Sequence, residues 1–209
     1  MSQTISGKTS QQGAVLLPEI KSVPPGPKTK ALVERDQKVM SASYTRDYPF
    51  VMDRGEGCIV WDPDGNSYLD MAAGIAVCAT GHSHPKVVEA ITTQTGRFLH
   101  MSGTDFYYEV QIRLAEALTS RAPVKGPGPN RIFFSNSGAE SVEGAMKLAR
   151  HYTRGHHNIA FYGSFHGRTM GALSLTGSKS VQRKGFSPFL PGVSHAVYGD
   201  KIENIEMML

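Results

Sequence analysis

The segment that most restricts the fold is "PNRIFFSNSGAESVEGAMKLAR", residues 129–150, where an apolar run is followed by small and polar residues and then by helical periodicity. The run Arg131–Phe134, bounded by Pro and Asn, predicts a buried strand. After the turn, Glu143 and Lys147 have the spacing of an i,i+4 ion pair on a helix. Four apolar residues have the spacing of one buried helix face: Val142, Ala145, Met146 and Ala149. The segment predicts a strand, a tight turn and a helix in that order.

The first turn of this predicted helix has the features of an anion site. Gly138 allows a ligand to approach the backbone closely, and the unpaired N–H groups that follow carry the positive end of the helix dipole. Two simpler interpretations compete: Ser137 is a helix cap only, or the Glu140 carboxylate occupies the dipole instead of an external anion. This segment alone leaves the choice open.

Composition narrows the class of protein. The chain has 209 residues, 40% hydrophobic and 19% charged, which is typical of a soluble globular protein. A formal net charge of +4 without a long basic run argues against a nucleic-acid partner. Cys58 and Cys78 are too far apart for a CxxC pair and too few for a disulfide framework, which favours a reducing cytoplasm. No apolar stretch approaches the length of a membrane span, so no membrane partner is expected.

The sequence divides into three parts. Residues 1–30 are polar and then Pro-rich, which predicts a flexible tail. Residues 31–75 predict a helix, which begins near Thr29, and a β-meander from about Phe50 to Asp70 with turns at "GEG" and "DPDGN". Residues 76–209 change to helices and strands. The further elements expected there are helices from Pro85 to about His100 and from Tyr108 to Arg121, strands in "HNIAFYG" and "HAVY", and a helix in "KIENIEMML".

Alternating strands and helices indicate the α/β class with a largely parallel sheet. Three strands covered by helices would leave a wide unpaired sheet edge, which a complete domain normally pairs or covers. We therefore expect residues 76–209 to be the first part of a larger domain that is truncated at its C-terminus.

The order of motifs resembles the class III aminotransferases, the ornithine, acetylornithine and 4-aminobutyrate type, between about Tyr48 and Asp200. The motifs are "GCIVWDPDGNSYLDMAAGIAV", "GHSHPKVVEAI", "FFSNSGAESVEGAMKLAR" and "GSFHGRTMGALSLTG". The resemblance implies the fold-type I scaffold and the cofactor pyridoxal 5′-phosphate.

The resemblance assigns cofactor contacts to two of these motifs. Ser137, Gly138 and Ala139 match the turn that binds the cofactor phosphate. In the "FHG" motif, Phe165 matches the aromatic ring that stacks on the pyridine, with His166 beside it, whereas without the motif Phe165 would be assigned to the core.

The resemblance also implies substrate contacts. Arg168 matches the arginine that binds a substrate carboxylate, a task suited to a guanidinium, although an exposed loop arginine is the simpler interpretation. Ile75 matches a pocket position whose aliphatic side chain resembles the 4-aminobutyrate enzymes. His82 and His84 lack nearby acidic or thiol ligands, so we expect them to serve the turn and not a metal.

Transamination requires a Schiff-base lysine and an acid at the pyridine nitrogen. Lys147, Lys179 and Lys184 do not match the family's lysine, so we expect it beyond Leu209 and expect the chain alone to be inactive. The implied reaction moves an amino group from a donor such as 4-aminobutyrate to 2-oxoglutarate in a homodimer. A racemase or epimerase of the same fold and a non-catalytic interaction module remain alternatives, whereas the absence of GxGxxG and GxxxxGK[ST] argues against a general nucleotide site.

Overall fold

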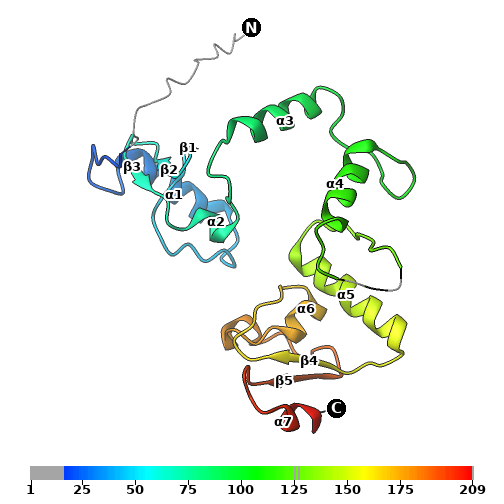
Figure 1. Cartoon of the computed structure of the whole chain (residues 1–209). Coiled ribbons are helices and arrows are strands. Elements are labelled where there is room, and N and C mark those ends of the chain that lie inside the picture. Colours follow the sequence, from blue (N-terminus) through cyan, green and yellow to red (C-terminus); the bar gives the residue numbers. More distant parts are fainter. Residues whose placement is uncertain (1–16, 125, 127, 209) are drawn as a thin grey trace. The chain divides into compact units, whose positions relative to one another are not determined.

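A computed structural model describes residues 17–124, 126 and 128–208 (Figure 1). The chain forms two compact units, Met1–Phe106 and Tyr107–Leu209, and each is described by itself. The domain boundary expected at residues 75–76 stays a prediction.

The first unit is built on a three-stranded antiparallel meander. Strands β1 (Arg54–Glu56), β2 (Ile59–Trp61) and β3 (Ser67–Leu69) pair in chain order, so the predicted meander is confirmed. Ile59 and Val60 are its buried apolar residues. The Asp62 carboxylate closes the β2–β3 turn by accepting hydrogen bonds from the backbone and side chain of Asn66 and from the Tyr68 hydroxyl. Burial raises the pKa of Asp62, but these bonds outweigh it and hold the pKa below its usual value.

The same turn holds the segment that precedes it in the chain. Asn66, which has no exposed surface, accepts from the N–H groups of Lys21 and Ser22 at 2.8 and 2.9 Å. The Asp64 carboxylate accepts from the N–H groups of Lys28 and Thr29 and so caps helix α1 (Pro27–Val39). Residues 19–29 are therefore fixed to the meander, which differs from the flexible tail expected over residues 1–30. Residues 1–16 of that expected tail lie outside the described residues.

The "GHSHP" segment packs on the same meander. The His82 imidazole contacts the Asp70 carboxylate at 2.6 Å, and its backbone pairs with Gly57. The hydrogen bond from His82, together with the N–H groups of Ala72 and Ala73, holds the pKa of Asp70 below its usual value. The described residues contain no group of three acidic, His or Cys side chains placed to hold a metal ion.

Three helices follow the meander and the turn after it. Helix α2 (Ala73–Ala76) is a single turn, and α3 (Pro85–Thr95) begins with Pro85 in its first turn, as predicted. Helix α3 ends before the expected His100 because Gly96, a poor helix former, stands at its C-cap. In the second unit, α4 (Glu109–Thr119) agrees within two residues with its prediction.

The second unit has a parallel two-stranded sheet covered by helices. Strands β4 (Asn158–Phe161) and β5 (Val193–Ala196) pair in parallel, and α5 (Gly138–Thr153), α6 (Met170–Leu175), a 3₁₀ turn (Ser180–Gln182) and α7 (Ile202–Glu206) complete it (Figure 1). Strand β5 begins and ends two residues earlier than the predicted strand in "HAVY", residues 195–198. The mixed α/β content agrees with the fold predicted from the sequence.

The predicted strand Arg131–Phe134 was wrong. No backbone hydrogen bond joins residues 131–134 to another described segment, and Phe133 is 75% exposed. An apolar run becomes a strand only where a neighbour pairs its N–H and C=O groups, and β4 pairs with β5 alone among the described strands.

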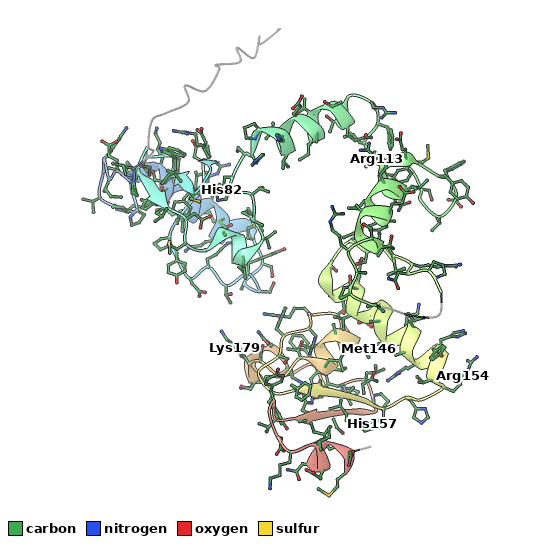
Figure 2. All side chains as sticks on the ribbon, viewed as in Figure 1. His82, Arg113, Met146, Arg154, His157 and Lys179 are labelled. Carbon is green, nitrogen blue, oxygen red and sulfur yellow. The ribbon has the colours of Figure 1, made fainter. Side chains whose placement is uncertain are left out.

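One part of α5 is packed in the core and another part is exposed. Met146 and Val142 pack with Ala160, Leu175, Leu190 and Val193 in the small core, and Figure 2 marks Met146 on α5. Ala145 and Ala149, expected on the same face, are exposed. Ala145 instead lines an open apolar hollow with Phe133, Gly144 and Leu148. None of the described helices is long and apolar enough to cross a membrane.

Candidate functional site

The start of α5 is a well-formed helix cap. The Ser137 hydroxyl accepts from the N–H of Glu140 at 3.2 Å, so Ser137 is the predicted N-cap. The Glu140 carboxylate reaches back to the backbone N–H of Asn136 at 2.6 Å and to its side-chain amide at 3.1 Å. The capping serine is thus present in the structure, and the Glu140 carboxylate bonds to Asn136, the residue before the cap.

These caps leave two N–H groups without a protein partner. Among the described residues, no acceptor receives a hydrogen bond from the backbone N–H of Gly138 or Ala139. Gly138 is exposed, and a Cβ built on it would meet no atom within 4 Å. The first turn of α5 therefore offers two adjacent donors without a partner among the described residues, at the positive end of a 16-residue helix.

The loop between β4 and α6 meets this first turn directly. Gly167 is buried with φ +137, and a Cβ built on it would lie 2.6 Å from the Cβ of Ala139 and 3.0 Å from that of Ala172. Only glycine fits between α5 and α6 with this backbone. The contact brings the two sequence-predicted cofactor motifs, residues 137–139 and 165–168, side by side within one unit.

The side chains of Phe165 and Arg168 in this loop are exposed. Phe165 is 56% exposed, so the alternative that it is a core residue is not what the structure shows. The Arg168 guanidinium lies 5.9 Å from the centroid of the Phe165 ring, at the outer limit of a cation–π contact. The His166 backbone N–H donates to the Thr176 hydroxyl at 3.0 Å, which fixes the loop. An exposed aromatic ring and a cation thus belong to the loop that meets the first turn of α5 through Gly167.

Ile75 lies in the other unit, and its side chain is 93% exposed. It belongs to α2, in which Ala73, Gly74, Ile75 and Ala76 all have positive φ angles between 47 and 64. A β-branched residue in this region is strained by roughly 1–2 kcal/mol. Six of the seven predicted site residues therefore belong to the second unit, and Ile75 belongs to the first.

Sequence reasoning missed two residues that hold this site. Glu143 was expected to pair with Lys147, but its carboxylate instead accepts from the Thr169 hydroxyl at 2.6 Å and from the N–H groups of Gly171 and Ala172. The expectation was wrong because the start of α6 supplies three donors on the same side of α5. The second residue is Thr176, which is fully buried and accepts from the His166 N–H. The sequence shows it only as a polar residue after an apolar run, which does not indicate this role.

Comparison with known proteins identifies the class of scaffold and then the family. The class-III aminotransferase family model matches residues 40–208. An acetylornithine aminotransferase of Methanothermobacter thermautotrophicus is 43% identical over 172 residues, which are 82% of this chain and 42% of that protein. An alanine/serine racemase of Pyrococcus horikoshii is 36% identical over 189 residues, which are 90% of this chain and 39% of that protein.

A solved structure of an aminotransferase is also similar to this chain. The ornithine aminotransferase of Toxoplasma gondii, whose structure shows partial occupancy of PLP at its active site, has a TM-score of 0.73 and 27% identity over 82% of this chain and 40% of its own. The scaffold is that of the fold-type I enzymes, and the chain belongs to the class III aminotransferases. It spans about two fifths of the length of the relatives it matches. Pyridoxal 5′-phosphate, predicted from the sequence, is the cofactor of this family.

Proposed function

We propose that this chain supplies the phosphate-binding turn and the ring-stacking loop of a pyridoxal 5′-phosphate site in an aminotransferase. The observation that carries the proposal is the contact between Gly167 and Ala139, because it joins the two motifs at the start of α5. Family membership supports the reaction class, and the geometry supports the assignment of residues.

The donor set fits the phosphate group. Two unpaired N–H groups, of Gly138 and Ala139, lie at a helix N-terminus, where backbone donors and the dipole both favour an anion. The Glu140 carboxylate is turned towards Asn136 and does not bond to these two N–H groups. A phosphate would therefore accept from two donors that have no partner among the described residues.

The other residues have separate roles in the proposal. Phe165 presents an exposed ring on which a flat heterocycle can stack, and the hydrogen bond from His166 to Thr176 keeps the loop in place. Arg168 offers a fork of donors to a substrate carboxylate. When bound, the cofactor supplies an electron sink for the amino-group carbon, which the protein's side chains lack.

The lysine of the reaction is not assigned to this chain. Lys147, Lys179 and Lys184 are all exposed, and Figure 2 marks Lys179 beside the loop that follows α6. An amine activated for covalent catalysis is normally desolvated or placed beside another cation. That the lysine belongs to another part of the whole protein, and that the isolated chain is inactive, stays a prediction.

N-Acetylornithine is the amino donor we favour, with 2-oxoglutarate as acceptor, because seven of the similar proteins are named acetylornithine aminotransferases. The sequence had favoured 4-aminobutyrate on Ile75 alone, and that donor is the alternative to test. A homodimer in the cytoplasm remains part of the proposal by resemblance to the family.

A second candidate, amino-acid racemisation, is favoured by the similarity to the alanine/serine racemase. Both reactions use the same phosphate turn and stacking ring, since neither group decides the fate of the substrate carbon. The two functions differ in whether an amino acceptor is consumed.

Two experiments test the proposal. Calorimetric titration with pyridoxamine 5′-phosphate, which has no aldehyde to react with surface lysines, should show one site that is weakened by Phe165→Ala; no binding would contradict the assignment. Chiral product analysis of the whole protein with and without 2-oxoglutarate then separates the reactions. Glutamate formed only with 2-oxoglutarate supports transamination, whereas D-alanine formed from L-alanine without it supports racemisation.

A further inference from the structure

We infer that Glu143 is a positioning residue of this site: its carboxylate holds the loop that carries Phe165 and Arg168 against the first turn of α5. The inference rests on the proposed function, since it concerns how the cofactor ring is placed relative to its phosphate. Glu143 itself touches neither group in the proposal.

The contacts of Glu143 are directed at one structural element. Its Oε1 atom accepts from the Thr169 hydroxyl at 2.6 Å, from the Gly171 N–H at 3.0 Å and from the Ala172 N–H at 3.2 Å. Thr169 is the N-cap of α6, and its own side chain does not cap that helix. The Glu143 carboxylate, which comes from a different helix, therefore serves as the cap of α6.

Two of the residues that donate to this carboxylate are buried, and one of them leaves room for it. Gly171 and Ala172 are buried, so without Glu143 their N–H groups would lose their acceptor where water has little access. A Cβ on Gly171 would collide with the Glu143 carboxylate. Glycine at this position thus leaves the space that the carboxylate fills.

The position of Glu143 along α5 explains why this cap affects the site. Glu143 follows Ala139 by four residues, so both lie on the same face of α5. Ala139 touches Gly167 and Glu143 binds residues 169, 171 and 172, so one helix face holds the loop at two points. Because the phosphate donors are the first N–H groups of this same helix, the distance from Phe165 to those donors depends on both contacts.

A second clamp closes the other side of the loop. The buried Thr176 hydroxyl accepts from the His166 N–H and bonds to the carbonyl of Gly167 at 3.1 Å. Residues 165–168 therefore lie between two hydrogen-bonded clamps, of which the Glu143 clamp is the one that comes from α5, beside the packing of Gly167 on Ala139. Loss of Glu143 should leave the loop attached to α6 but movable relative to the phosphate turn.

The test compares four variants of this chain: Glu143→Ala, Glu143→Gln, Thr169→Val and the control Lys147→Met. Lys147 lies one turn further along α5, and no ion pair between it and Glu143 is present among the described residues. Two measurements are made on each: amide hydrogen exchange of residues 163–176 without cofactor, and the dissociation constant for pyridoxamine 5′-phosphate.

We expect Glu143→Ala to speed exchange at Gly171 and Ala172 about tenfold or more and to weaken binding by a similar factor, as loss of a charge-assisted hydrogen bond implies. Glu143→Gln should keep part of the slow exchange and part of the binding, since its amide oxygen still accepts hydrogen bonds. Thr169→Val should have an intermediate effect on exchange and on binding. Lys147→Met should match the original chain. Glu143→Gln and Thr169→Val keep the test decisive if Glu143→Ala does not fold.

The possible results separate this inference from the proposed function. Unchanged exchange in Glu143→Ala and Glu143→Gln would overturn the clamp itself. Faster exchange with an unaltered dissociation constant would show a structural role only and overturn the positioning role. If the original chain does not bind the cofactor analogue at all, the proposed function falls and the positioning role falls with it, whereas the exchange data still report on the clamp.

Discussion

Gly167→Ala is the substitution that most severely tests the contact between the loop and α5. A residue with a side chain at φ +137 costs about 1–3 kcal/mol in backbone strain. The new Cβ would also lie 2.6 Å from the Cβ of Ala139, and since a methyl group on a helix cannot rotate away, the loop must shift at a further cost of about 1–3 kcal/mol. We expect a loss of about 4 kcal/mol in the free energy of unfolding, a large part of the stability of a typical domain.

Gly163→Ala is the matched control. Gly163 also has a positive φ, +83, but a Cβ built on it meets nothing within 4 Å, so it should lose only the backbone contribution of about 1–2 kcal/mol. Urea denaturation followed by far-UV circular dichroism measures both variants. Emission from Trp61, the only tryptophan of the chain, reports on the first unit in the same samples.

The double variant Gly167→Ala with Ala139→Gly isolates the clash. Removing the Ala139 methyl group should recover about 1–2 kcal/mol beyond the sum of the single effects, because the two residues are in direct contact. If Gly167→Ala is no more harmful than Gly163→Ala, or if the two substitutions are additive, the loop does not pack on the first turn of α5 and the reasoning fails.

Further predictions follow from single contacts. Ser137→Ala should lower the stability of the second unit by about 1 kcal/mol in urea denaturation, because α5 loses its N-cap. Asn66→Ala should cost about 3 kcal/mol, measured by Trp61 emission, because the N–H groups of Lys21 and Ser22 lose the fully buried side chain that accepts from them. The hydrogen bond from His82 lowers the pKa of Asp70. The contribution of Asp70 to stability is therefore complete above the unfolded pKa of about 3.9 and is lost as pH falls through the lower folded pKa. The urea midpoint of Asp70→Asn should vary less between pH 5 and pH 3 than the midpoint of the original chain.

Local elements with strong signals could be predicted from the sequence. Pro85 at a helix start, Ser137 as an N-cap and the "DPDGN" turn each depend on a few neighbouring residues, and all three are confirmed. The family could be predicted because four motifs stand in its order, and the family model matches residues 40–208.

Features that depend on a distant partner could not be predicted. Residues 131–134 carry a strand pattern, but pairing requires a neighbouring strand that a local pattern does not specify. The bonds of Glu143 depend on where α6 begins in space, and at the sequence level a lysine four residues away was the nearest partner. Ser137, Gly138, Ala139, Phe165, His166 and Arg168 were chosen by resemblance, and their roles remain to be tested.

The most direct test of the central claim is a titration of the ¹⁵N-labelled chain followed by amide chemical shifts. With pyridoxamine 5′-phosphate, the amides of Gly138 and Ala139 and those of residues 165–168 should shift together. Pyridoxamine, which lacks the phosphate, should leave Gly138 and Ala139 unaltered. If pyridoxamine 5′-phosphate shifts other residues and leaves these two amides in place, the start of α5 is only a capped helix and the proposed cofactor site is wrong.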